Sequence, residues 1–230
     1  ESRGFANHGW LKSYHTFSFA NYYDPDRTNF GALRVLNDDW VSAAMGFGTH
    51  PHKNMEIISI PLAGELEHKD SMGTVARIKA GDIQVMSAGT GIAHSEYNAS
   101  GKDPVQFLQI WIIPNQMNVK PRYDQITLQK SDLQNRLAQI VSPNENEEGV
   151  WIHQNAWFHM GQFEEGKEQS YSLKKAENGL YAFVLEGSFW IDETEINRRD
   201  GLAITGIDAI QIRSKSKGST ILLMEVPLEF

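Results

Sequence analysis

Short runs of apolar residues, some alternating with polar ones, recur along most of the chain and are separated by Gly, Asn, Asp and Pro. Such runs are typical of β-strands, whereas the 3.6-residue spacing of an amphipathic helix is scarce. The clearest runs are ALRVLND, MEIISIPLAG, ARIKAGDIQVMSAG, VQFLQIWIIP, YAFVLEGSFWIDE and STILLMEVPL. Because little helix is predicted between them, the chain is expected to be all-β and to form an antiparallel sandwich or barrel.

One segment departs from this pattern. Residues 128–141, LQKSDLQNRLAQIV, place apolar residues near helical spacing and are soon followed by Pro143. They predict a short helix or a single helical turn. The polar run SPNENEEG at residues 142–149 then predicts an exposed loop.

The sequence also contains a weak internal repeat. PLAGELEH followed by AGDIQVMSAG is similar to VLEGSFWI followed by DGLAITGIDA in the second half of the chain. In each copy one glycine, Gly64 or Gly187, ends an apolar strand, and a second glycine, Gly81 or Gly201, opens the next strand. The repeat is compatible with two related β-units and equally with the general similarity of β-hairpins.

Two short stretches concentrate side chains that bind metals. THPHKNME places His50 and His52 two residues apart with Glu56 after them, and IAHSEYN places His94 and Glu96 two residues apart. Alternate side chains of a strand share a face, so each pair lies on one face, and Glu56 joins the first pair if its strand stays regular. If the two strands meet inside a barrel, these side chains suit a first-row divalent ion and leave coordination positions open.

The residues around the two stretches strengthen this hypothesis. A single H-x-H pair is more often structural than functional, but a second same-face pair makes a site more plausible. Gly46 and Gly48 precede the first pair, and Gly89 and Gly91 precede the second. Glycine lets the backbone turn closely around a small centre.

The composition limits which metal ligands, nucleophiles and partners are possible. The chain has no cysteine, which excludes disulfides, thiolate ligands and cysteine nucleophiles and leaves nitrogen and oxygen to bind any metal. Lys plus Arg number 21 and Asp plus Glu 29, a net charge of −8 without a basic run, so direct nucleic-acid binding is not expected. No apolar run reaches the roughly 18 residues of a membrane span, so we expect a cytoplasmic protein with no membrane partner.

The longer stretches around the histidines resemble a known family. GFGTHPHKNMEIISIPLAGELEHKDSMG, AGDIQVMSAGTGIAHSEYN and the opening HGWLKSYHTFSFANYYDP are similar to the metal-binding domain of the pirin family of bicupins. GLYAFVLEGSFWID and RDGLAI are similar to the second domain of that family. The resemblance implies an all-β fold of two cupin barrels of the jelly-roll type, with only short helical segments. The N-terminal cupin domain, residues 1–125, would carry the metal site, and the C-terminal cupin domain, residues 126–230, would lack metal ligands.

The resemblance also implies a set of ligands. It assigns His50, His52, His94 and Glu96 to one divalent transition metal ion, which the sequence leaves open among Fe, Ni, Cu, Mn, Co and Zn. Cupins outside this family take their acid from the position of Glu56, and strand parity allows either carboxylate. We prefer Glu96 because H-x-E is the pirin pattern, and we assign Glu56 to hydrogen bonds that support the ligands or the core.

Several pirins are flavonol dioxygenases, so the resemblance implies an enzyme of the quercetin 2,3-dioxygenase type. It would use O2 to open the heterocycle of a small planar phenolic substrate, with the metal lowering the pKa of the flavonol hydroxyl and Glu96 taking its proton. The alternative is a metal-containing, redox-responsive regulator that binds a protein partner, with flavonol turnover incidental. A third hypothesis is a bicupin that acts on another small metabolite. We expect a monomer.

The remaining histidines are expected outside the site. We interpret His8 and His15 as packed, hydrogen-bonded residues and His68 as part of an ordinary polar turn. His153 and His159 are assigned to the second unit, without a second metal.

Large side chains near the histidines in the sequence could line a pocket for a planar substrate. They are Phe47, Met55, Met86, Phe107 and Trp111. Core packing is the expectation for most of them, and alternation alone does not tell which face of the barrel each takes.

Overall fold

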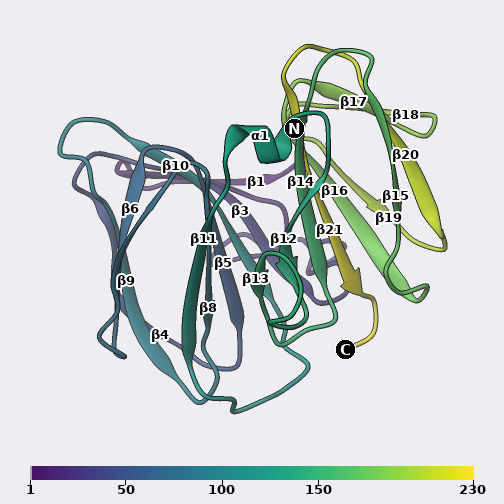
Figure 1. The fold of residues 1–230 in the computed structure, drawn as a ribbon. Helices are drawn as coiled ribbons and strands as arrows, with labels where there is room; N and C mark the ends of the chain where they lie inside the picture. The colour runs from purple at the N-terminus through teal and green to yellow at the C-terminus, as the bar shows by residue number, and fades with distance from the viewer. Residues whose placement is uncertain (1) are drawn as a thin grey trace. The chain divides into compact units, whose positions relative to one another are not determined.

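Strands account for most of the structure, a computed structural model that describes residues 2–230 (Figure 1). The one helix among these residues is a single turn, α1 (Lys130–Leu133). The predicted all-β fold is therefore confirmed. The segment 128–141 contains the predicted helical turn and then continues as a strand, β12 (Ala138–Ser142). No helix within residues 2–230 is long and apolar enough to cross a membrane.

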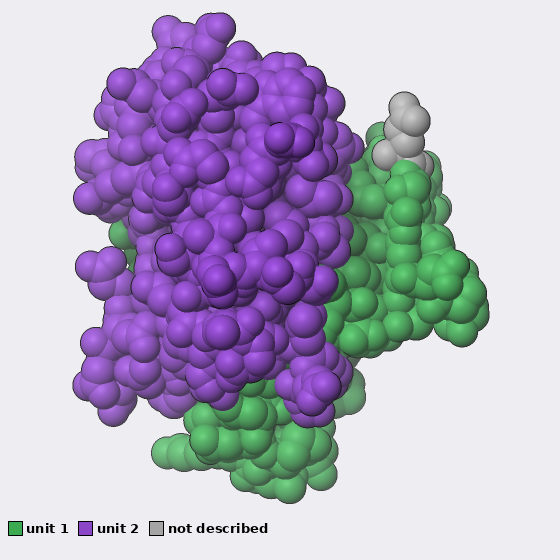
Figure 2. All heavy atoms as spheres, turned by 90° about the vertical axis from the view of Figure 1, so that its right-hand side faces the viewer, with its two compact units in different colours: residues 1–127, 152–154 green, residues 128–151, 155–230 purple. Residues whose placement is uncertain are grey.

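The chain divides into two compact units, which Figure 2 shows in different colours. Unit 1 comprises residues 1–127 and 152–154, and unit 2 comprises residues 128–151 and 155–230. The short segment 152–154 joins unit 1 through one backbone and one side-chain hydrogen bond: Asn115 N donates to His153 O at 2.7 Å, and the side-chain Nε2 of Gln154 donates to Ile113 O at 2.8 Å. The division into a metal-carrying domain at 1–125 and a metal-free domain at 126–230 stays a proposal.

Unit 1 consists of two antiparallel sheets. Within the described residues, the larger sheet has seven strands, in the spatial order β1 (Gly4–Asn7), β2 (Leu11–His15), β3 (Leu33–Val41), β10 (Val105–Ile112), β5 (Glu56–Ala63), β8 (Asp82–Ser87) and β11 (Arg122–Thr127). The smaller sheet has the order β4 (Gly46–His52), β9 (Ile92–Asn98), β6 (Glu65–Asp70) and β7 (Val75–Lys79). Leu66 and Ile78 of the smaller sheet pack against Val41, Val105 and Phe107 of the larger one, so the two sheets enclose a common interior.

Unit 2 also has two sheets. Its larger sheet has the order β13 (Val150–Trp151), β12, β14 (Trp157–Phe163), β21 (Ser219–Pro227), β16 (Asn178–Glu186) and β19 (Gly201–Ile204). Its smaller sheet has the order β15 (Glu168–Ser172), β20 (Ala209–Ser214), β17 (Ser188–Ile191) and β18 (Thr194–Asn197).

The two units share one strand order. The run β3-β10-β5-β8 of unit 1 matches β14-β21-β16-β19 of unit 2, and β4-β9-β6-β7 matches β15-β20-β17-β18. The internal sequence repeat falls on corresponding strands, because PLAGELEH covers the β5–β6 hairpin and VLEGSFWI covers the β16–β17 hairpin. Gly64 and Gly187 occupy the two turns with φ of 78° and 73°, which favour glycine. The repeat therefore reflects two related units.

The interiors of the two units differ. Unit 2 is filled by a cluster of buried apolar side chains that includes Phe163, Phe189, Ile210 and Ile212. Unit 1 instead carries a buried row of polar residues that are successive cross-strand partners on β2, β3, β10, β5 and β8. This polar row consists of His15, Asn37, Gln109, Ser59 and Gln84, each at most 9% exposed.

Candidate metal centre

The two predicted histidine pairs lie on adjacent strands. β4 and β9 pair antiparallel, with His50 opposite His94 and a bulge between Phe47 and His50. The bulge changes the register so that both histidines of β4 approach His94 of β9. Ligand nitrogens of His50, His52 and His94 lie within 4.8 Å of one another. The structure thus brings together the three histidines that the sequence singles out.

Burial favours the neutral form of two of these imidazoles, which is the form that binds metals. Burial, reinforced by His50, lowers the pKa of His52 to about 4. Burial lowers the pKa of His94 to about 3, with smaller contributions from His50 and His52. His50 Nδ1 lies 2.8 Å from the carbonyl oxygen of Gly48. Because a carbonyl only accepts, this Nδ1 carries a hydrogen, so Nε2 is the nitrogen of His50 that is available to a metal.

Several of these ring nitrogens have no other role. His52 Nε2 and both ring nitrogens of His94 are buried and lack a hydrogen-bond partner among residues 2–230. Buried polar atoms without partners are costly and call for an explanation. Three imidazoles that converge fit a divalent transition metal ion, which would take one lone pair from each ring.

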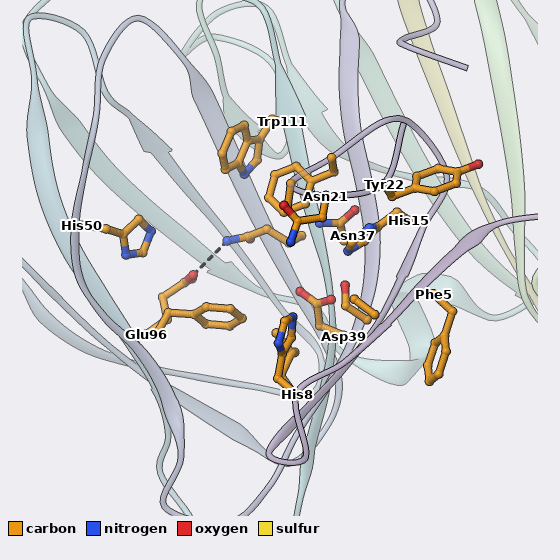
Figure 3. Close-up of a pocket in the computed structure, with 17 residues that line it drawn as sticks. Phe5, His8, His15, Asn21, Tyr22, Asn37, Asp39, His50, Glu96 and Trp111 are labelled. Carbon is orange, nitrogen blue, oxygen red and sulfur yellow. Dashed lines mark hydrogen bonds between the residues drawn. The ribbon is translucent and has the colours of Figure 1, made fainter. Parts of the chain in front are cut away.

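Glu96 lies beside the histidines at the wall of the same interior. The residue is 1% exposed, and its carboxylate accepts from Ser59 Oγ at 3.0 Å and from Gln109 Nε2 at 2.8 Å, the latter drawn as a dashed line in Figure 3. Both donors belong to the polar row. Burial raises the pKa of Glu96. One carboxylate oxygen lies within 4.8 Å of ligand nitrogens of His94 and His68.

Glu56 does not share the face of His50 and His52, so the assumption of a regular strand through this region is wrong. β4 ends at His52 and β5 begins at Glu56, and between them Asn54 turns the chain with φ of 50°. Ser59 reaches Glu96, so Glu56, an odd number of residues away, takes the opposite face of β5. There it accepts from Ser87 Oγ at 2.6 Å, and burial raises its pKa to about 7.

His68 is not part of an ordinary polar turn, and that expectation is wrong. It lies on β6 opposite Glu96, with its side chain fully buried, and its ring centroid is 5.3 Å from that of His94. Nε2 of His68 donates to Asp70 Oδ2 at 3.0 Å. Strand parity could have revealed this position, because Leu66 two residues earlier is an apolar inward residue.

Of the other histidines, His8 and His153 differ from expectation, whereas His15 is packed and His159 lies in the second unit, as expected. His8 is exposed, and His15 is buried edge-on against Phe19, with no hydrogen-bond partner for its Nδ1 within the described chain. His153 belongs to unit 1. His159 is a buried residue of unit 2, with its ring centroid 4.9 Å from that of Tyr171, and burial lowers its pKa to about 4.

A cavity of about 460 Å³ opens beside His50 and Glu96 (Figure 3). Phe5, Phe19, Tyr22, Phe47 and Trp111 give it aromatic walls. Two of the large side chains near the histidines in the sequence, Phe47 and Trp111, therefore line it.

The other three large side chains pack elsewhere. Met86 and Phe107 are fully buried in the core, and Met55 packs against an apolar cluster beside Trp111. The cavity volume falls within the range of about 300–1,000 Å³ that is usual for small-molecule sites.

Comparisons with known proteins find relatives over nearly the whole chain. A family model described as Pirin matches residues 1–112, and one described as the quercetinase C-terminal cupin domain matches residues 139–226. A quercetin 2,3-dioxygenase of Escherichia coli (strain K12) is 44% identical over 98% of this chain and 95% of its own length. A pirin-like protein of Caulobacter vibrioides is 36% identical over 96% of this chain and 94% of its own length.

A solved structure of a relative has the same fold as this chain. The crystal structure of the bacterial pirin YhhW from Escherichia coli in complex with nickel(II) superposes with a TM-score of 0.92 and 42% identity. The match covers 98% of this chain and 95% of that one. The predicted architecture of two cupin barrels is therefore confirmed.

Proposed function

The chain belongs to the pirin family, and on this basis we propose that it is a metal-dependent flavonol dioxygenase of the quercetin 2,3-dioxygenase type. The observation that carries the proposal is a cluster of three imidazoles, one of which, His94, also lies close to the buried carboxylate of Glu96, beside an aromatic cavity that His50 and Glu96 line. The name of the relative from Escherichia coli supports the substrate class.

In this proposal His50, His52, His94 and Glu96 hold one divalent transition metal ion. Nickel is one candidate, since the related pirin was crystallised with nickel(II). When bound, the ion supplies Lewis-acid stabilisation of negative charge on a substrate hydroxyl oxygen. His50 is prepared for this role because the bond from Nδ1 to Gly48 O fixes its ring and its tautomer.

Glu96 is the proposed catalytic residue that receives the hydroxyl proton on a carboxylate oxygen. Ser59 and Gln109 hold the carboxylate in place with one hydrogen bond to each oxygen. The raised pKa of Glu96 favours retention of the proton after transfer. Ser59 and Gln109 therefore position the acid.

The aromatic walls of the cavity support a planar ring system as the substrate. Phe19 and Trp111 meet edge to face at a centroid distance of 5.4 Å, and the ring of Trp111 also lies 5.0 Å from that of His52. A flat substrate between such walls would bury apolar surface, exclude water and present its oxygen atoms to the metal side of the cavity.

The test is oxygen uptake on addition of quercetin to protein loaded in turn with Fe(II), Mn, Co, Ni, Cu and Zn. We expect saturable uptake that depends on the metal. His94→Ala should lose the metal and at least about 100-fold of the activity, because it removes a ligand rather than a supporting hydrogen bond.

Glu56→Gln is the matched control, because it alters a buried carboxylate of the same unit that faces Ser87. It should keep both metal and uptake. Full metal occupancy in His94→Ala would contradict the ligand assignment. Metal binding without oxygen uptake by the wild-type protein would instead favour the regulatory alternative.

A further inference from the structure

The cavity has a second polar region away from the metal ligands. In Figure 3, His50 and Glu96 lie on one side of the cavity, and His15, Asn37 and Asp39 lie on the other. We call these three residues and the neighbouring Ser13 the distal cluster.

Strand pairing builds the distal cluster. Asn37 and Asp39 are two residues apart on β3, and the neighbouring β2 places His15 opposite Asn37 and Ser13 opposite Asp39. All four side chains therefore project from the same face of the sheet into the interior of unit 1. The flanking positions on β3 are apolar, which makes the polar cluster a local exception.

The atoms of the distal cluster are buried and incompletely paired. Asn37 and His15 are 3% exposed, and Asp39 is 4% exposed. Within residues 2–230 no protein group provides a hydrogen bond to Asn37 Oδ1, Asp39 Oδ1 or His15 Nδ1. Such atoms destabilise the folded protein unless something else satisfies them.

The chemistry of these atoms defines what would satisfy them. Asn37 Oδ1 and Asp39 Oδ1 are oxygen atoms that accept hydrogen bonds from a donor. Burial raises the pKa of Asp39 to about 7, opposed by the hydrogen bond from Ser13. A ligand that brings hydroxyl groups to this side of the cavity provides the missing donors.

We propose that the distal cluster is a hydroxyl-recognition subsite that binds the phenolic hydroxyls on the part of the substrate remote from the metal. The inference rests on the proposed function, since it takes one end of a planar phenol to lie at the metal ligands. It makes flavonols with hydroxyls on the pendant ring the preferred substrates over flavonols that lack them. Asp39 and Asn37 are the specificity-determining residues.

The test measures binding rather than turnover. Ni(II)-loaded protein is titrated under anaerobic conditions with quercetin and with the flavonol that lacks both pendant-ring hydroxyls, by calorimetry. We expect the wild-type protein to bind quercetin at least about tenfold more tightly, the effect of one buried hydrogen bond. Asp39→Ala should reduce the ratio of the two affinities to near one. The metal content and the affinity for the flavonol without pendant-ring hydroxyls should stay unchanged.

Two further variants keep the result interpretable. Asp38→Ala is the matched control, because this acid follows Asn37 on the same strand but faces the other way, 3.3 Å from Arg3. It should keep the wild-type preference. Asp39→Asn retains the shape and one oxygen acceptor and should keep part of the preference, which guards against loss through misfolding.

Three outcomes would overturn the subsite. They are an equal affinity of the wild-type protein for both flavonols, a preference that survives in Asp39→Ala, and an equal weakening of both ligands in that variant. The proposed function is tested separately. Oxygen uptake without a preference for pendant-ring hydroxyls would contradict only the subsite. A preference for these hydroxyls without oxygen uptake would contradict only the dioxygenase activity.

Discussion

His159 shows how burial of a single residue ties stability to pH. Its side chain is 7% exposed in the apolar interior of unit 2, beside Tyr171. Burial lowers its pKa from 6.5 to about 4, and the positive charge of Lys174 adds to the effect. The folded protein therefore binds a proton at His159 more weakly than the unfolded chain does.

The sign of the pH effect follows from this shift. The contribution of His159 to stability is complete above pH 6.5 and is lost as the pH falls toward 4. In urea unfolding at pH 7 and pH 4, the wild-type protein should lose roughly 3 kcal/mol more than His159→Gln, which has no group to titrate. His8→Gln, an exposed position, should behave as the wild type does. Parallel losses in the wild type and His159→Gln would argue against the prediction.

Strand parity predicts residues only where the strand is regular and its inward face is known. It placed His94 beside Glu96 correctly, because both lie on the uninterrupted strand β9. It failed at Glu56 because Asn54 turns the chain before β5 begins. The importance of Asp39 could not be read from the sequence, since nothing local tells which face of β3 lines a cavity.

The close approach of β4 to β9 is the element on which the metal site depends. Gly46 lies opposite Tyr97, where a Cβ atom would collide with Glu96 O and come within 2.5 Å of Tyr97 Cα. Both neighbours are backbone atoms, so relief requires the strands to separate. Gly48, two residues along, has space, with Tyr97 Oη 3.8 Å from the position of a Cβ.

This contrast gives a matched pair of variants. Gly46→Ala should weaken Ni(II) binding at least tenfold and lower the free energy of unfolding by about 1–3 kcal/mol, because the strand of His50 and His52 moves away from that of His94. Gly48→Ala should change both quantities little. Metal titration and urea unfolding measure the two effects. If Gly46→Ala binds nickel as tightly as the wild type, the strand spacing does not control the site.

At the same scale, the sequence predicted the long strands better than the first segment of unit 2. The helical spacing in residues 128–141 yields only α1, because Ala138–Ser142 forms β12 and pairs with β14 and β13. Partners that lie elsewhere in the chain decide the structure of such a short segment, and its local pattern cannot reveal them.

At the scale of the whole molecule, every proposed ligand lies in unit 1. Bound metal raises the free energy only of those local openings that break the site. Its removal should therefore increase opening only near the site. We expect chelation of the metal to increase hydrogen exchange in residues 46–52 and 92–98 and to leave residues 178–186 and 219–227 unchanged. Mass spectrometry of peptides from loaded and stripped protein measures this. Faster exchange in the unit 2 peptides would contradict a site confined to unit 1.

The shared strand order of the two units bears on how such a chain arose. β9 buries His94 and Glu96 at alternate positions, and the corresponding strand β20 buries Ile210 and Ile212 in the same alternation. One ancestral unit copied in tandem would give this arrangement, in which the eight shared strands kept their order while inward side chains changed and further strands were added at the sheet edges. Unit 2, whose interior is filled by apolar side chains, then remains a backbone on which a second metal site could evolve or be engineered by replacing a few isoleucines.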